Sequence, residues 1–262
     1  MLPALLAVSG CASVPLKTGG TLTSYSNLGP SEGRFSKTRS YADAQGLASA
    51  KTARIIPSAF SASAAAEVPL PNDRMLIANG LDRALCIGLS NRYRMVPDGV
   101  PADLTVQSTV TDIVLTDKIM AGVSTVTTLG SSAVSPVGLP RIPIGLGGLA
   151  MEAEALDRDG VQRAAMVWSR GANSIQDSPR YSEIGDAYGL ATRFGDEFAE
   201  LLVSGTDSQG FSVSLPKGHE IKSWLGRKPK YVACDQFGRA AGIPGAIVSQ
   251  FGAPPQWTEK RP

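Results

Sequence analysis

Strict alternation of side-chain polarity over residues 104–111, within a strand predicted at residues 104–115, is the sequence feature that most constrains the fold. Leucine, valine and one serine alternate there with threonine and glutamine. A period of two is typical of a strand that buries one face against a core. Residues 148–156 and 161–170 predict two further strands, and the Asp-Arg-Asp-Gly stretch between them suits a hairpin turn.

Two helices are predicted beside these strands. Ile77, Leu81, Leu85 and Leu89 repeat every four residues, which predicts an amphipathic helix over residues 73–92. A second helix is expected to start at Ser182, which would cap it, and to end at Gly205. Its apolar side is formed by Ile184, Tyr188, Ala191, Phe198 and Leu202.

The order of the predicted elements indicates the fold class. Residues 51–58 and 93–96 predict additional short strands, so the order is strand, helix, four strands, helix. The simplest arrangement is an α+β fold, in which an antiparallel sheet of four to five strands carries two helices packed on one face. A tail rich in glycine and proline follows this unit.

The N-terminus carries a targeting pattern. Residues 6–11, Leu-Ala-Val-Ser-Gly-Cys, end a run of about seven apolar residues, which is too short to span a bilayer. The pattern resembles a bacterial lipobox, which implies cleavage between Gly10 and Cys11 and acylation of Cys11, with palmitate as one of the acyl groups. Ala12 favours export to the outer membrane, facing the periplasm. The alternative is a buried N-terminal strand ending in a core cysteine.

These patterns divide the chain into four parts. Residues 1–10 are expected to be a signal peptide, and residues 11–49, rich in Gly, Ser and Thr, a lipid-anchored flexible tether. Part of the tether could dock, because Leu22, Tyr25 and Leu28 recur every three residues. Residues 50–205 form the α+β domain. Residues 206–262 form a C-terminal extension, expected to dock in part through its aromatic residues.

The sequence offers little for chemistry. His219 is the single histidine, no Gly-x-Ser-x-Gly motif occurs, and no His/Cys cluster has metal-ligand spacing. We therefore expect no enzyme, and no catalytic, cofactor-binding or metal-binding residues. A net charge of +2 without a basic aromatic cluster gives no reason to expect nucleic-acid binding. Cys86 and Cys234 could form a disulfide in an oxidising periplasm, or remain two separate buried thiols.

Two further candidates for a functional surface remain, an acidic group at the predicted hairpin and a long segment of low charge before it. Glu152 and Glu154 share one strand face, next to Asp157 and Asp159 in the turn, and are interpreted as a solvated polar surface. Residues 119–151 contain Arg141 as their only charged residue, and a connection this long is often functional. Buried strands or a disordered loop are the alternatives. The apolar residues of this candidate interaction segment are Ile119, Met120, Val123, Val126, Leu129, Val134, Val137, Leu139, Ile142, Ile144 and Leu146.

Several of these motifs together resemble a known family. They are the lipobox, residues 20–28 (Gly-Thr-Leu-Thr-Ser-Tyr-Ser-Asn-Leu), the leucine-rich helix, residues 102–106 (Ala-Asp-Leu-Thr-Val) and residues 151–160 (Met-Glu-Ala-Glu-Ala-Leu-Asp-Arg-Asp-Gly). In this order they are similar to the bacterial lipoproteins of domain of unknown function 3313, over roughly residues 11–205. The resemblance implies location and fold, and no reaction. We expect a membrane-attached lipoprotein that binds an envelope protein partner. A carrier or sensor of a small apolar ligand such as a lipid is the alternative.

Overall fold

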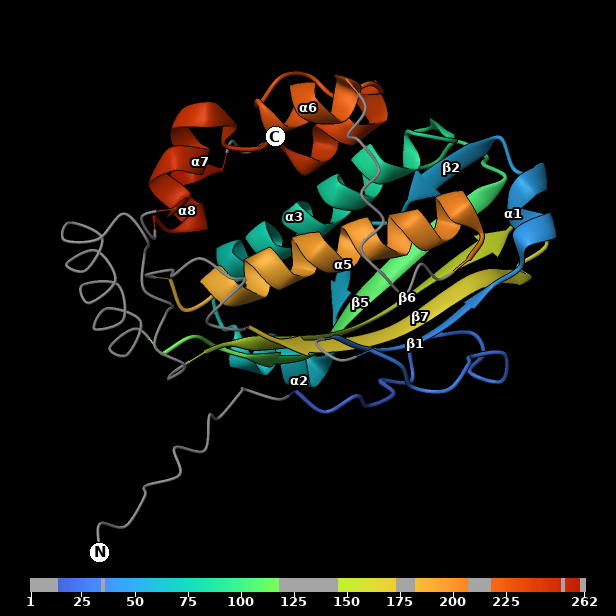
Figure 1. Cartoon of the computed structure of the whole chain (residues 1–262), viewed down its shortest axis with the longest axis horizontal. Coiled ribbons are helices and arrows are strands. Elements are labelled where there is room, and N and C mark those ends of the chain that lie inside the picture. The colour runs from blue at the N-terminus through green and yellow to red at the C-terminus, as the bar shows by residue number, and fades with distance from the viewer. Residues whose placement is uncertain are drawn as a thin grey trace, which may run out of the picture.

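A mixed sheet of seven strands forms the centre of the protein (Figure 1). The computed structural model describes residues 14–33, 36–117, 146–172, 182–206, 218–250 and 253–259. The spatial order is β1-β7-β6-β5-β2-β4, with β3 also paired to β5. The strands are β1 (Ser36–Ala42), β2 (Thr52–Ile55), β3 (Ala59–Phe60), β4 (Arg94–Met95), β5 (Leu104–Val114), β6 (Gly148–Asp157) and β7 (Gln162–Gly171).

The sheet is larger than predicted and not purely antiparallel. Strands β5, β6, β7 and β1 pair antiparallel, whereas β2 and β3 run parallel to β5, and β4 runs parallel to β2. The parallel pairs arise because the chain leaves β2, passes through a long helix and returns to the same sheet, as a crossover connection must. The prediction of a four- to five-stranded antiparallel sheet was therefore wrong in strand number and in direction.

Helices cover both faces of this sheet. They are α1 (Ala44–Ser49), α2 (Ala62–Glu67), α3 (Pro71–Leu89), α5 (Gly185–Ser204), α6 (Gly218–Trp224), α7 (Gly242–Gln250) and α8 (Pro255–Thr258), with a 3₁₀ turn, η1, at Val232–Phe237. The long helices α3 and α5 lie side by side on one face, as predicted, and α2 lies on the other (Figure 1). All four periodic residues of α3 are buried, which confirms its predicted apolar side.

The two long helices approach each other closely at glycines. A Cβ on Gly195 would lie 2.8 Å from the carbonyl oxygen of Leu81, so only glycine permits this spacing. Helix α5 ends at Gly205, which has a φ of 74°, as the sequence predicts. Ser182 does not cap α5, contrary to the prediction. The cap position is Ile184, and the Ser182 hydroxyl instead donates to Oε1 of Gln256 at 3.3 Å.

The C-terminal extension adds a third layer over α3 (Figure 1). A disulfide joins Cys86 in α3 to Cys234 in η1, the pairing that the sequence left open. Arg83 forms an ion pair with Glu259 at 2.7 Å, and both side chains are only 10% exposed. The described parts of the extension are therefore docked on the helices. None of the helices described is both long enough and apolar enough to cross a bilayer.

Candidate functional site

The N-terminal strap, defined here as residues 14–28, lies on the sheet face opposite α3 and α5. Leu22 and Leu28 are buried against Ala165 and Val167 of β7. The neighbouring side chains of β7, such as Trp168, point to the other face and join the helix-side core. The prediction that part of the tether docks through Leu22, Tyr25 and Leu28 is confirmed. The flexible tether expected for the rest of residues 11–49 was wrong where the structure describes it. Residues 14–33 pack on the sheet, and residues 36–49 form β1 and α1.

Glu152 of β6 is the centre of the contact between the strap and the sheet. Its Oε1 accepts a hydrogen bond from the backbone N–H of Gly19 at 2.6 Å. Its Oε2 accepts three more, from the backbone N–H of Thr21 (3.1 Å), the Thr21 hydroxyl (2.5 Å) and the Tyr25 hydroxyl (2.8 Å). The strap thus supplies all four donors to a carboxylate that is 0% exposed.

Glu154, two residues further along β6, is bound in the same way. Thr23 donates its backbone N–H and its hydroxyl to the two carboxylate oxygens, each at 2.9 Å. The side-chain amides of Gln107 and Gln162 donate the remaining two hydrogen bonds, each at 2.6 Å. Burial of an unpaired carboxylate is costly, and these charge-assisted hydrogen bonds are what offsets that cost.

This arrangement corrects the interpretation of the two glutamates as a solvated surface. The sequence correctly places them on one strand face, but the strap covers that face and excludes water. The strap also affects Tyr25, because burial, together with its hydrogen bond to Glu152, raises the pKa of the phenol above its ordinary value of 10.0. One sequence feature could have indicated that the glutamates are covered. Residues 21–25, Thr-Leu-Thr-Ser-Tyr, are rich in hydroxyl donors.

Two glycines allow the strap to approach the sheet closely. A Cβ on Gly19 would lie 2.4 Å from Cγ2 of Thr111, and one on Gly148 would lie 2.3 Å from Cγ2 of Val14. Real Cβ contacts are longer than this, so a larger residue at either position would have to displace the side chain that it meets. Val14 itself is buried, and the strap therefore begins in firm contact with the first residue of β6.

A pocket of about 200 Å³ opens beside the strap. It is lined by strap residues Thr21 and Leu22, by the loop after β2, and by residues 107–109 of β5. The carboxylates at its wall, Glu152 and Glu154, already accept the hydrogen bonds described above. The pocket is smaller than the 300–1,000 Å³ typical of small-molecule sites.

A buried aspartate lies under the other side of the sheet. Asp82 of α3 accepts hydrogen bonds from the backbone N–H (3.0 Å) and the hydroxyl of Ser58, and the Ser58 and Ser108 hydroxyls are 2.6 Å apart. Burial raises the pKa of Asp82 to about 7, although the Ser58 hydrogen bonds act in the opposite direction. The group joins α3 to the strands.

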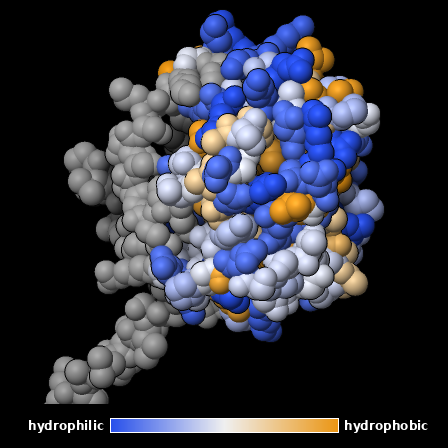
Figure 2. Space-filling model, turned by 90° about the vertical axis from the view of Figure 1, so that its right-hand side faces the viewer, coloured by the Kyte–Doolittle hydropathy of each residue, from blue (hydrophilic) through white to orange (hydrophobic). Residues whose placement is uncertain are grey.

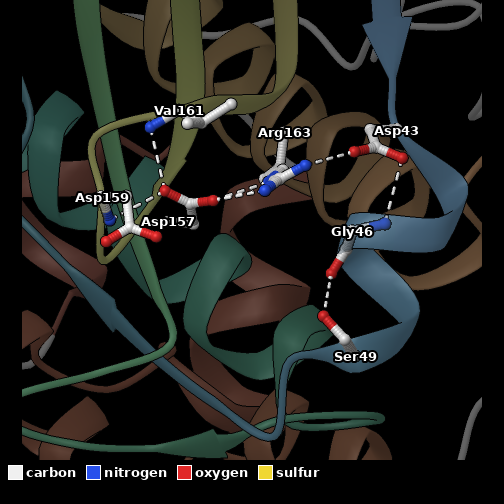
Figure 3. A network of polar contacts seen from close by, with 7 residues as sticks. All are labelled: Asp43, Gly46, Ser49, Asp157, Asp159, Val161 and Arg163. Carbon is white, nitrogen blue, oxygen red and sulfur yellow. Dashed lines mark hydrogen bonds and ion pairs between the residues drawn. The ribbon is translucent and has the colours of Figure 1, made fainter.

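A second polar network closes the opposite end of the sheet (Figure 3). The Arg163 guanidinium lies between Asp43 and Asp157, with N–O distances of 2.6 and 2.7 Å. Asp43 also caps α1 by accepting the backbone N–H of Gly46. That hydrogen bond, followed by Arg163, lowers the pKa of Asp43. This network fixes α1 to the β6–β7 hairpin.

The turn of that hairpin has the chemistry that the sequence predicts. Asp157 accepts the backbone N–H groups of Asp159 and Val161, each at 2.9 Å. Burial acts to raise the pKa of Asp157, but the hydrogen bonds from Val161 and Arg163 outweigh it and the pKa is lowered. Within the described ranges, no three His, Cys, Asp or Glu side chains are grouped so as to hold a metal ion.

The remaining predicted site residues fall into two groups. Cys11, Gly10 and the interaction-segment residues from Ile119 to Ile144 lie outside the described residues. Leu146 is described and buried, and residues 148–151 belong to β6 rather than to a loop. The two ends of the interaction segment meet at Asp186 of α5, which accepts the Thr116 hydroxyl and the Gly147 N–H, each at 2.9 Å.

Comparison with known proteins identifies the class to which this fold and site belong. The model of a family described as "Protein of unknown function (DUF3313)" matches residues 17–198, which include most of the strap, both glutamates and most of the helix-side core. The chain therefore belongs to the DUF3313 family. No curated protein matches the chain.

Two solved structures are distantly similar. A PelC dodecamer from Paraburkholderia phytofirmans is 11% identical with a TM-score of 0.39, and a variant of the same dodecamer is 13% identical with a TM-score of 0.36. Each match covers 64% of this chain and 97% of the other. At TM-scores below 0.5 neither structure defines the fold of this chain, which rests on its own sheet and helices.

Proposed function

We propose that the protein is an outer-membrane lipoprotein, acylated at Cys11, whose periplasm-facing domain is not an enzyme and binds a protein partner of the envelope. The observation that supports this most is the position of Val14. It is buried against Gly148 only three residues after Cys11. Three residues span at most about 10 Å, so acyl chains on Cys11 would hold the folded domain directly at the bilayer surface.

The strap links the proposed lipid anchor to the folded domain through many contacts. Eight hydrogen bonds to the two buried glutamates were described above, six of them from the strap itself, and two buried leucines add apolar contact with β7. A lipid-anchored chain with this arrangement would be fixed in orientation rather than free on a tether. A fixed orientation suits a protein that presents a defined surface to a partner.

The interaction segment would be presented at the end of the molecule where Val14 contacts the sheet. Its flanking residues, Thr116 and Gly147, meet at Asp186, and Gly147 directly precedes the glycine that contacts Val14. Replacing residues 119–145 by a short Gly-Ser linker should therefore leave the fold intact and abolish partner binding. The alternative function, an apolar-ligand carrier, is less supported by the pocket beside the strap, because that pocket measures only about 200 Å³ and more than half of its lining residues are polar.

Cell fractionation tests the anchor. Wild-type protein should be found in the outer-membrane fraction and incorporate labelled palmitate, whereas Cys11→Ser should be unlabelled and should lose the firm membrane retention that acyl chains give. The double variant Cys86→Ser/Cys234→Ser is the control, because it removes the other two cysteines and should remain labelled. Wild-type protein without label, or Cys11→Ser that incorporates as much label as the wild type, would refute the lipoprotein proposal.

A further inference from the structure

Large exposed apolar side chains gather at one end of the molecule, around the contact between α8 and the start of α3. Trp257 of α8 is 80% exposed and Leu70, just before α3, is 62% exposed. Met75 of α3 and Ile243 and Val248 of the neighbouring α7 are exposed as well. We call these five residues the apolar end. Apolar side chains gathered on a surface mark a contact with a partner or a membrane.

The apolar end is held in place by specific contacts. Gln256 donates a hydrogen bond to Asp73 of α3 at 2.9 Å, so Trp257 lies next to the helix turn between Leu70 and Met75. Glu259 anchors the other side of α8 through its ion pair with Arg83. A Cβ on Gly245 of α7 would lie 3.5 Å from Cβ of Thr258, which brings α7 against α8. Trp257 is therefore exposed on a docked helix and does not belong to a loose tail.

A path of contacts connects this end to the start of the strap. Val14 packs on Gly148, and the adjacent Gly147 donates to Asp186 in the first turn of α5. Ser182, just before α5, donates to Gln256 of α8. Figure 1 shows the same arrangement, with α7, α8 and the first turns of α3 and α5 at one end of the molecule. The opposite end, seen in Figure 2, is mostly hydrophilic with only scattered hydrophobic residues.

We propose that the apolar end is a membrane-binding surface, in which Trp257, Leu70 and Met75 insert into the interfacial region of the bilayer. The inference rests on the proposed acylation of Cys11, which would place lipid within about 10 Å of Val14 at this same end. Tryptophan favours the interfacial region because its ring is apolar and its N–H remains hydrated. The acyl chains and the apolar end would then form two attachments that fix the domain on the membrane.

Vesicle binding by unacylated protein tests this surface independently of acylation. The protein is residues 11–262 with Cys11→Ser, which keeps every described residue and omits the apolar leader. Vesicles of phosphatidylethanolamine and phosphatidylglycerol are floated on a density gradient. Trp257→Ser should lower the partition coefficient about tenfold, the loss expected for one large apolar side chain.

Val232→Ser is the matched control. Val232 is 84% exposed on η1. The disulfide of Cys234 holds η1 at Cys86, about 20 Å along α3 from Asp73. This control should change the partition by less than about twofold. Brominated lipids should also quench the fluorescence of the parent protein more strongly than that of Trp257→Phe.

The outcomes separate this inference from the proposed function. Equal vesicle binding by the parent, Trp257→Ser and Val232→Ser would overturn the membrane-binding surface, even if Cys11 is acylated in cells. A dimer that Trp257→Ser dissociates, without vesicle binding, would also overturn it and assign the surface to a second copy of the chain. Vesicle binding through Trp257 without palmitate incorporation in cells would support the surface and refute the acylation.

Discussion

Replacing Glu152 by glutamine should release the strap while leaving the rest of the domain folded. The carboxylate accepts four hydrogen bonds from the strap, and a glutamine amide nitrogen can accept none of them. In the best orientation of the glutamine, its amide nitrogen faces the Gly19 N–H, so that one buried donor loses its acceptor. The other three hydrogen bonds then go to a neutral amide oxygen instead of a charged carboxylate. The strap should be weakened by about 2–4 kcal/mol, since a buried unsatisfied group costs about 1–3 kcal/mol and charged hydrogen bonds exceed neutral ones.

Hydrogen exchange measures this loss locally. At 1.36 kcal/mol per tenfold change, the backbone amides of residues 19–23 should exchange roughly 30- to 1,000-fold faster in Glu152→Gln. Amides of β5, β6 and β7 should keep their wild-type protection. Glu67→Gln, which changes an exposed glutamate on α2, is the control and should leave both regions unchanged. An equal loss of protection in strap and sheet, or no loss in either, would refute the role assigned to Glu152.

Three further predictions test other parts of the structure. The folded-state pKa of Asp82, about 7, lies above its ordinary 3.8, so its protonated form favours folding and that stability is lost as the pH rises from about 4 to 7. Asp82→Asn should remove a decline of up to about 4 kcal/mol across this range in urea unfolding, and an unchanged pH profile would contradict the assignment. Cys86→Ala/Cys234→Ala should lower the unfolding free energy by about 2–5 kcal/mol and expose the C-terminal helices to limited proteolysis, whereas undiminished resistance would show that the disulfide does not hold them. Arg163→Met should lower the melting temperature and Arg163→Lys should lower it less, because lysine keeps one of the two ion pairs; equal melting of all three proteins would argue against the network.

The long periodic elements could be predicted from the sequence. The four-residue repeat of α3 and the alternation of β5 each reflect one buried face of a single element, and this information is local. The hairpin of β6 and β7 was predicted for the same reason, with its turn at Asp157 closed as expected. The ends of these elements differ from the prediction by at most three residues.

Two strands, β1 and β3, were not predicted, whereas the short strands predicted at residues 51–58 and 93–96 are found as β2 and β4. β1 reads Ser-Lys-Thr-Arg-Ser-Tyr-Ala and has no apolar period, because it is an edge strand held by backbone hydrogen bonds to β7. β3 contains only two residues, too few to show any period. Its pairing depends on β5, which brings the partner backbone into place.

The candidate site was missed for a different reason. The period of two places Glu152 and Glu154 on one face, but their environment depends on a strap segment more than 120 residues away in sequence. Two glutamates on a strand are usually solvated, and no local pattern shows that hydroxyl and amide donors will cover them. The hydroxyl-rich run at residues 21–25 acquires its meaning only when the structure brings it to β6.

The mass of the mature N-terminus tests the central claim most directly. Protein purified from outer membranes is digested, and the peptide that begins at Cys11 is analysed by mass spectrometry. The account predicts that residues 1–10 are absent and that Cys11 carries a diacylglyceryl group and an N-linked acyl chain. An unmodified Cys11 within a peptide that continues into residues 1–10 would contradict it.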